Sequence, residues 1–343
     1  MPDTTLRPAL PREAERISAL AIRSKAHWGY SPEQMQVFSG ELTLRPDELV
    51  PRNTHVLMEG DALLGFYTLV DDESDNGPEL EHLFLDPSVL KQGLGTRLLR
   101  HAQGLARARR FSRIRVQSDP NAAGFYRALN YRHLRDVPSS IPGRSIPIFE
   151  LALEEPGRSP GGIPDWLDTE RLLLNAPHPD YAEAIVQGVT ESFRELQRWM
   201  PWADQIPSLD GETARLAESR RRHEQDLEAT FFVFRREDGL FLGAIGIPRM
   251  DWEQGCFEIG YWIRTSRVGN GYASEALRTL ATFAFRELSA RRVEVRMSDD
   301  NQPSRQVAEA VGCRLEQILD GDGTHPDGSP RNTRVYLATA PTP

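Results

Sequence analysis

The sequence contains two cysteines, two lysines and no long apolar run. Cys256 and Cys313 belong to neither a Cys-x-x-Cys pair nor a His/Cys cluster, so we expect no disulfide framework and no metal site. No segment approaches the roughly 18 apolar residues that span a membrane, and the first five residues lack the basic and apolar regions of a secretory signal. These absences predict a cytoplasmic protein without a membrane partner.

Positive charge is not in excess either. The chain has 41 Lys and Arg against 50 Asp and Glu, a net charge of −9. Binding to nucleic acid needs clustered cations that neutralise phosphates, so we expect no nucleic-acid partner. Apart from Lys25 and Lys91, every basic residue is arginine, a bias typical of a GC-rich bacterial genome.

The length of 343 residues suggests two domains. A break stands at residues 154–164, where three prolines and three glycines in eleven residues exclude a helix or a central strand. We predict an N-terminal domain at 1–153, a linker at 154–166 and a C-terminal domain at 167–343.

Hydrophobic periodicity predicts the same order of elements in both halves. In the first half we expect strands at 4–8, 55–58, 62–70, 79–85, 114–117, 131–135 and 146–153, and helices at 12–25, 32–43, 96–109 and 121–129. In the second half we expect strands at 171–174, 230–234, 240–247, 257–263, 293–297, 315–319 and 334–339, and helices at 179–187, 191–199, 211–227, 274–288 and 304–311. The fold class is therefore α/β (α+β mixed), with two domains that each have a mostly antiparallel twisted sheet of about seven strands flanked by helices.

A glycine-rich turn lies between the fourth strand and the next helix of each half. It reads Gln92-Gly-Leu-Gly-Thr96 in the first half and Asn270-Gly-Tyr-Ala273 in the second, with Gly93 and Gly271 178 positions apart. Such a turn leaves backbone N–H groups unpaired at the positive end of a helix dipole, and glycine lets the main chain approach a bulky anion. The pattern predicts a phosphate site. It is not a P-loop, because no Gly-Lys-Ser/Thr follows.

On these residues both halves resemble the GNAT family of acyl-CoA N-acyltransferases, whose motif Arg/Gln-x-x-Gly-x-Gly/Ala holds the pyrophosphate of coenzyme A. The first motif position departs from the pattern, because Leu90 and Val268 occupy it. The C-terminal half resembles the RimJ/RimL branch in Gly271-Tyr-Ala-Ser-Glu-Ala-Leu277 and in Asn301-Gln-Pro-Ser304. The resemblance covers roughly 4–153 and 168–339. It implies an N-acetyltransferase that moves acetyl from acetyl-CoA to a primary amine by direct attack.

The resemblance also implies which residues bind the coenzyme: those of the turn, of the preceding strand end, whose main chain pairs with the pantetheine arm, and an asparagine further on. In the first half these are Leu83, Phe84, Leu85, Lys91, Gln92, Gly93, Leu94, Gly95, Thr96 and Asn121. In the second half they are Tyr261, Trp262, Ile263, Val268, Gly269, Asn270, Gly271, Tyr272, Ala273, Asn301 and Ser304.

Acid and base candidates differ between the halves. In the first, Asn121-Ala-Ala-Gly-Phe-Tyr126 resembles the family segment whose tyrosine protonates the leaving thiolate, which assigns this role to Tyr126. A phenol stays protonated at neutral pH, although a tyrosine here can equally be part of the core. Asn121 can also cap its helix. Glu81 is the base candidate, with His82 as a rival and a solvent-facing strand carboxylate as the alternative.

In the second half that tyrosine is missing, because Gln306 occupies the matching position. Ser304 is the candidate donor to the thiolate, with helix capping as the alternative interpretation. Glu258 is the base candidate, again with a solvent-facing carboxylate as the alternative.

Acceptor residues are expected next to these sites. They are His27, Trp28 and Tyr30 at a helix junction of the first half, and Trp199 and Trp202 of the second half, whose segment 198–203 resembles the substrate loop of the RimJ/RimL branch. A hydrophobic cover between helices is the alternative for that segment. The acceptor is a small-molecule amine or a peptide or protein N-terminus. Two other functions stay open: an acyl-CoA-binding regulatory or scaffold protein with one or both domains silent, and a tandem enzyme resembling mycothiol synthase.

Overall fold

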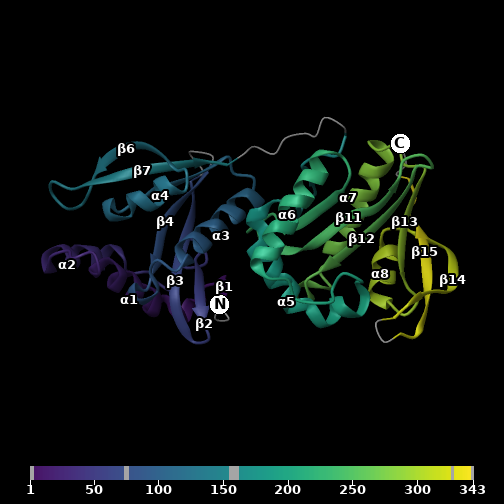
Figure 1. Cartoon of the computed structure of the whole chain (residues 1–343), viewed down its shortest axis with the longest axis horizontal. Helices are drawn as coiled ribbons and strands as arrows, with labels where there is room; N and C mark the ends of the chain where they lie inside the picture. The colour runs from purple at the N-terminus through teal and green to yellow at the C-terminus, as the bar shows by residue number, and fades with distance from the viewer. Residues whose placement is uncertain (1–3, 73–76, 154–161, 326–327, 341–343) are drawn as a thin grey trace. The chain divides into compact units, whose positions relative to one another are not determined.

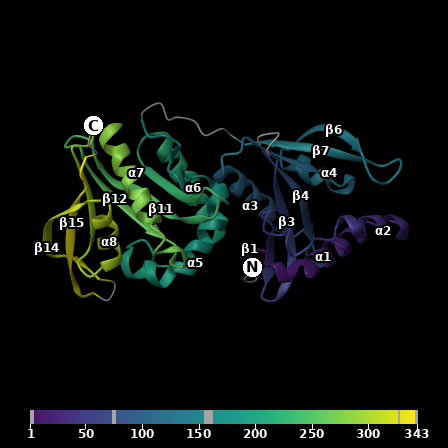
Figure 2. The same cartoon turned by 180° about the vertical axis from the view of Figure 1, so that it is seen from behind.

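The chain consists of two compact units, Met1–Glu155 and Pro156–Pro343. The structure, a computed structural model, describes residues 4–72, 77–153, 162–325 and 328–340. Figures 1 and 2 show each unit from opposite sides. Most of the predicted linker, residues 154–161, lies outside the described residues.

The first unit is built on a seven-stranded sheet in the order β1-β2-β3-β4-β5-β7-β6. Its strands are β1 (Thr4–Pro8), β2 (His55–Glu59), β3 (Ala62–Asp72), β4 (Gly77–Leu85), β5 (Arg113–Gln117), β6 (Arg132–Pro138) and β7 (Ser145–Ala152). Its α-helices are α1 (Ala14–Ala26), α2 (Pro32–Glu41), α3 (Leu94–Ala108) and α4 (Ala123–Ala128). Neighbouring strands pair antiparallel except β4 and β5, which are parallel.

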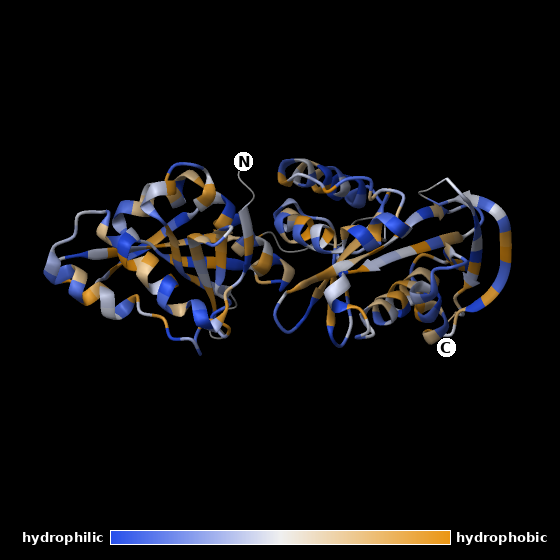
Figure 3. Cartoon of the chain, turned by 90° about the horizontal axis from the view of Figure 1, so that it is seen from below, coloured by the Kyte–Doolittle hydropathy of each residue, from blue (hydrophilic) through white to orange (hydrophobic). Residues whose placement is uncertain are grey.

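Two hydrophobic clusters hold this sheet between its helices. One contains the buried side of α3, including Leu98, Leu99 and Ala102, together with strand residues. The other contains Ile17 and Leu20 of α1 with further strand residues. Because apolar residues spaced three and four apart share one side of a helix, each helix buries a single face. Figure 3 shows this mixture of hydrophobic and hydrophilic residues along the helices and strands of both units.

The second unit is built on an eight-stranded sheet in the order β14-β15-β13-β12-β11-β10-β9-β8. Its strands are β8 (Trp166–Asp168), β9 (Leu172–Asn175), β10 (Ala229–Arg235), β11 (Phe241–Asp251), β12 (Cys256–Ile263), β13 (Arg292–Ser298), β14 (Arg314–Thr324) and β15 (Pro330–Leu337). Its α-helices are α5 (Ala182–Trp199), α6 (Leu209–Glu224), α7 (Tyr272–Arg286) and α8 (Gln302–Ala310). Again one pair, β12 with β13, is parallel.

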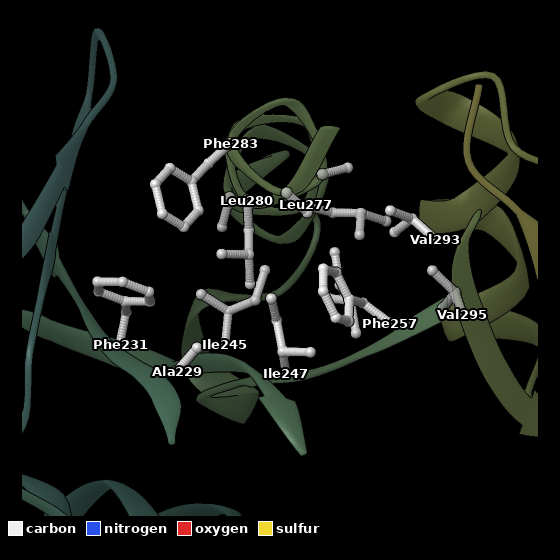
Figure 4. Packing of buried hydrophobic residues seen from close by; sticks show 14 of the residues in the cluster. Ala229, Phe231, Ile245, Ile247, Phe257, Leu277, Leu280, Phe283, Val293 and Val295 are labelled. Carbon is white, nitrogen blue, oxygen red and sulfur yellow. The ribbon is translucent and has the colours of Figure 1, made fainter. Parts of the chain in front are cut away.

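The core of the second unit lies beneath α7. Figure 4 shows side chains of this helix meeting side chains of the sheet: Leu277, Leu280 and Phe283 from the helix, and Phe231, Ile245 and Phe257 from the strands. No helix within the described ranges combines the length and apolarity needed to cross a membrane.

The predicted fold class is confirmed, with two mostly antiparallel sheets flanked by helices. Two details differ from the prediction. The short strand β8 lies partly in the predicted linker and pairs with β9. The helical segments predicted at 179–187 and 191–199 form a single helix, α5, preceded by a 3-10 turn at Pro179–Tyr181. Gly188 weakened the helical pattern, but it has a packing role, because a Cβ atom there would lie 2.8 Å from the Phe241 ring.

Candidate functional site

The glycine-rich turn has the same backbone shape in both units. In the first unit Lys91 and Gly93 have φ angles of 64° and 83°, and in the second Gly269 and Gly271 have φ angles of 79° and 77°. Gly93 and Gly271 are the N-caps of α3 and α7, and neither helix start receives a side-chain cap. The first N–H groups of both helices therefore have no intrahelical or capping partner, which is the geometry of an anion site.

The two turns are equivalent residue by residue. Helices α3 and α7 are both 15 residues long and both begin directly after the N-cap glycine. A 3-10 turn precedes each loop, at Pro87–Val89 and Thr265–Arg267. All these features lie 178 positions apart, so the sequence offset is also a structural equivalence.

The strand before each turn continues past the ladder that it shares with its parallel neighbour. The β4–β5 pairing ends at Leu80 with Val116, whereas β4 continues to Leu85. The β12–β13 pairing ends at Glu258 with Glu294, whereas β12 continues to Ile263. At each strand end, the edge that faces the parallel neighbour therefore lies beyond the hydrogen-bonded ladder of that pair. An extended ligand can add backbone hydrogen bonds at such an edge.

The other edge of each strand end packs very closely against its antiparallel neighbour, β3 or β11. A Cβ atom at Gly65 would lie 2.8 Å from the Phe84 carbonyl oxygen, and one at Gly243 would lie 2.1 Å from the Trp262 carbonyl oxygen. These glycines pair with Leu85 and Ile263, the last residues of β4 and β12. Glycine is therefore required where β3 and β11 approach the predicted coenzyme strands.

Tyr126 lies in the hydrophobic cluster that also contains Leu85 and Leu94, which flank the first turn. Its side chain is 4% exposed and its ring packs against Phe149. Burial raises the pKa of its hydroxyl, so the group is protonated at neutral pH. Helix α4, which carries Tyr126, touches the start of α3, because the ring of the adjacent Phe125 lies 3.6 Å from the position of a Cβ atom on Gly95.

The two predicted base candidates of the first unit have opposite environments. Glu81 is 37% exposed at its side chain and forms an ion pair with Arg52. His82 is buried, and its Nδ1 lies 2.8 Å from the Thr68 hydroxyl. Burial lowers the pKa of His82, so its imidazole is neutral at neutral pH. The side chain that the sequence ranked second is therefore the one held in the form of a base.

The junction between α1 and α2 contributes Tyr30 to a partly buried charge cluster. The Tyr30 hydroxyl donates to Asp119 at 2.7 Å, and Lys25 and Arg144 approach the same carboxylate at 2.6 and 2.9 Å. The Asn121 amide donates to the Tyr30 hydroxyl at 3.2 Å, so the structure brings together a predicted acceptor residue and a predicted coenzyme residue. The other two predicted acceptor residues of this junction, His27 and Trp28, are exposed.

The expected capping role of Asn121 is wrong. Asp119 is the N-cap of the 3-10 turn Pro120–Ala122, and its carboxylate accepts from the Asn121 N–H. Sequence reasoning missed Asp119, although an acidic residue directly before proline is a recognised helix-start signal.

In the second unit, Asn301 caps α8 and Ser304 does not. Asn301 is the N-cap of α8 and accepts from the Ser304 N–H at 3.1 Å. The Ser304 side chain instead lies 3.1 Å from the Tyr261 hydroxyl, which also donates to the Ser304 carbonyl at 3.1 Å. Burial raises the pKa of Tyr261. Tyr261 was predicted only through its main chain, so its side-chain contact with Ser304 is a feature that the sequence did not indicate.

Glu258 lies at the last position of β12 that pairs with β13. Its carboxylate is 3.4 Å from Arg249 and 3.9 Å from Arg296. Both distances are longer than a close ion pair, and the side chain is half-buried. The carboxylate is therefore only loosely paired with these two arginines.

The predicted acceptor tryptophans follow α5. Trp199 is the last residue of this helix, and its indole N–H donates to Glu195 at 2.7 Å. Trp202 is 50% exposed, and its ring centroid lies 6.2 Å from that of Trp262 at the end of β12. Trp262 also contacts Phe241. Trp202 thus lies beside Trp262, a residue of the predicted coenzyme strand.

Comparison with known proteins places these features in a family. Two family models, each described as an acetyltransferase (GNAT) domain, match residues 171–314 and 29–139. "Putative ribosomal N-acetyltransferase YdaF" of Bacillus subtilis (strain 168) is 30% identical over 170 residues, covering 49% of this chain and 90% of the relative. The chain belongs to the GNAT acetyltransferase family. The resemblance found in the sequence is confirmed, and N-acetyltransferase is the enzyme class of this family.

Further relatives of this GNAT protein act on ribosomal proteins by name. The ribosomal-protein-serine acetyltransferase of Escherichia coli (strain K12) is 26% identical over 151 residues, covering 44% of this chain and 83% of the relative. A solved structure of RimL, a ribosomal L7/L12 alpha-N-protein acetyltransferase in complex with coenzyme A, has 21% identity and a TM-score of 0.47, and the match covers 52% of this chain and 98% of that one.

Proposed function

We propose that this GNAT protein transfers an acetyl group from acetyl-CoA to a primary amine, with a coenzyme site in each unit. The observation that carries the proposal is the repeated combination of an uncapped helix start and a strand end that continues past the ladder with its parallel neighbour. The uncapped N–H groups suit the pyrophosphate of the coenzyme, and the open strand edge suits an extended pantetheine arm. Acetyl-CoA supplies the acyl group, and the residues of the chain orient the reactants and move protons.

In the first unit we assign the acid role to Tyr126 and the base role to His82. An amine must lose a proton before it attacks, and the departing thiolate gains one. A neutral imidazole accepts the proton of the ammonium group, and the protonated phenol donates toward sulfur. Glu81 is the weaker base because Arg52 already neutralises its charge.

In the second unit we assign the donor role to Ser304 and the base role to Glu258. The Tyr261 hydroxyl donates its proton to the Ser304 carbonyl and lies 3.1 Å from Ser304 Oγ, so it holds the start of α8 and the serine side chain in place beside β12. Tyr261 is therefore a positioning residue in this proposal.

The acceptor that we favour for the second unit is the N-terminal amine of a protein, and a small-molecule amine is the alternative. The names of the relatives from Bacillus subtilis and Escherichia coli support a ribosomal protein as this acceptor. Exposed aromatic side chains suit the same choice, because Trp202 beside Trp262 offers stacking surface for a peptide.

The test measures acetyl-CoA turnover by the full chain on peptides with varied N-termini and on a panel of small amines. Tyr126→Phe and Ser304→Ala report on the two units separately, and Arg278→Ala, an exposed change on α7, is the control. We expect each site variant to lose part of the turnover and the control to keep all of it. Coenzyme binding without turnover on any acceptor would contradict the enzyme proposal and favour a binding or scaffold role.

One observation favours a second candidate, a tandem enzyme in which one unit supports the other. The second unit has Gln306 where the first has Tyr126, so the two sites do not share an acid. Loss of all turnover in Tyr126→Phe alone, with Ser304→Ala unchanged, would select this arrangement.

A further inference from the structure

An arginine outside the glycine-rich motif lies against the second turn. Arg171, directly before β9, donates from Nη1 to the Asn270 carbonyl at 3.0 Å. Its Nη2 would lie 3.4 Å from a Cβ atom on Gly271. Its guanidinium also lies over the Tyr272 ring, 5.0 Å from the centroid. Arg171 therefore contacts three successive residues of the turn, although it is about 100 positions away in sequence.

Glu275, in the first turn of α7, fixes this arginine. Its carboxylate accepts from Arg171 Nε at 2.7 Å and from the Arg171 backbone N–H at 3.0 Å, and it lies 2.6 Å from Nη2. A guanidinium has five N–H donors. The contacts to Glu275 and Asn270 use three of them, which leaves one on Nη1 and one on Nη2. The side chain is 48% exposed, so these two donors can reach a ligand at the turn.

The first unit also has an arginine near its turn, but this arginine belongs to the helix that follows the turn. Arg97 is the equivalent of Glu275, 178 positions earlier, and its Nη2 donates to the Thr4 carbonyl of β1 at 3.0 Å. Helix α3 contributes the cation in the first unit, whereas the residue directly before β9 contributes it in the second. The turns differ accordingly, since Lys91 of the first turn corresponds to Gly269 in the second.

We infer that Arg171 is a phosphate-binding residue of the second unit, which gives its two remaining N–H donors to the pyrophosphate of the coenzyme. It supplies the positive charge that the second turn lacks at Val268 and Gly269. A planar guanidinium held on one side by a carboxylate is suited to bidentate contact with phosphate oxygens on the other. The inference rests on the proposed function, because it needs the coenzyme at this turn.

The experiment measures equilibrium binding of coenzyme A to the full chain in a Gly93→Val background. A β-branched residue at a φ angle of 83° distorts the first turn, so the second site is read alone. Arg171→Ala removes the guanidinium, and Arg171→Gln keeps a donor for the Asn270 carbonyl without the charge. Arg278→Ala removes an equal charge from an exposed position of α7. Pantetheine, which lacks the phosphates, is the control ligand.

We expect Arg171→Ala and Arg171→Gln to weaken coenzyme A binding about tenfold, with pantetheine binding and the Arg278→Ala control unchanged. Wild-type affinity in Arg171→Gln would overturn the inference, because the arginine would then only brace the turn. Equal losses for coenzyme A and pantetheine would overturn it as well. If the background itself binds no coenzyme A, the proposed function of the second unit fails instead, which is a distinguishable result.

Discussion

Replacing Gly243 by alanine tests how strictly the close strand approach positions the second site. The new Cβ atom would lie 2.1 Å from the Trp262 carbonyl oxygen and 2.9 Å from Ile263 Cα. Both partners are main-chain atoms, so no side-chain rotation relieves the contact. Gly243 also has a φ angle of 155°, which L side chains rarely adopt.

The cost follows from these two features. Contacts below 3.0 Å are essentially absent for real Cβ atoms, so the end of β12 must move by about 0.9 Å, the difference between 3.0 and 2.1 Å. Overpacking costs about 1–3 kcal/mol and the unfavourable φ a similar amount. We therefore expect a loss of about 3 kcal/mol in the unfolding free energy of the second unit, or about 6–12 °C in its melting temperature.

Gly260→Ala, on the neighbouring strand β12, is the matched control. Its Cβ atom would meet only Pro248 Cγ, at 3.8 Å, an ordinary contact. Thermal unfolding and coenzyme A binding are measured for both variants in the full chain. Gly243→Ala should lower the melting temperature and weaken binding, whereas Gly260→Ala should keep both near wild type. Equal behaviour of the two variants would refute the argument that the Trp262 carbonyl is held by close packing.

Three further results are expected. Tyr261→Phe should lower the turnover of the second unit and destabilise it by about 1 kcal/mol, whereas unchanged turnover with Ser304→Ala inactive would exclude a positioning role. His82→Gln should remove the acidic limb of the pH–rate profile of the first unit, and that limb should lie below the ordinary pKa of about 6.5 because burial lowers the pKa of His82. Burial also lowers the pKa of His101, so the folded chain resists its protonation. Stability should fall as pH drops below about 6.5, by up to about 1.4 kcal/mol per pH unit, and the slope in a urea titration should be smaller in His101→Gln.

The turns were predictable from sequence because their shape is local. Glycine at 93 and at 271 adopts positive φ, and the helix begins at the next residue in both units. The residues that determine this shape are neighbours in the chain, so a short motif predicts it. The strand-end edges were predicted through the family resemblance, and the pairing pattern agrees with the geometry that this use requires.

Side-chain partners across the sheet were not predictable in the same way. The register of β3 with β4 breaks between Thr68, which pairs with His82, and Leu69, which pairs with Leu80. Glu81 therefore lies at the register shift, exposed between the buried side chains of Leu80 and His82. A bulge of this kind leaves no signature in the residues themselves. The sequence ranked Glu81 above His82 as the base, whereas in the structure Glu81 is the exposed side chain and His82 the buried one.

The same reasoning explains why the contact of Tyr261 with Ser304 was missed. The two residues are 43 positions apart, and their proximity depends on how α8 packs against β12 at the point where the β12–β13 ladder ends. Local patterns assign each residue to its element, but the distance between elements follows from the complete sheet. Ser304 was therefore named as a candidate from its own segment, while its hydrogen-bond partner Tyr261 was assigned to main-chain contacts alone.

The two units share the main-chain features of the site and differ in its side chains. The 178-residue offset relates Gly65 to Gly243, Leu80 to Glu258, and the start and end of α3 to those of α7. Past these helices the offset changes, and the acid candidates are Tyr126 on α4 and Ser304 on α8. Because main-chain groups suffice to hold phosphates and an extended arm, we expect coenzyme affinities within about tenfold of each other but different acceptor preferences.

Gly93→Val and Gly271→Val, each in the full chain, separate the two contributions, since each blocks one turn at a φ angle of 83° or 77°. Coenzyme binding should fall by one site in either variant. Turnover on a given acceptor should fall mainly in one variant, because His82 and Tyr126 present a neutral base and a phenol, whereas Glu258 and Ser304 present a carboxylate and an alcohol. Matching losses for every acceptor tested would contradict the view that the side chains, and not the coenzyme turns, distinguish the units.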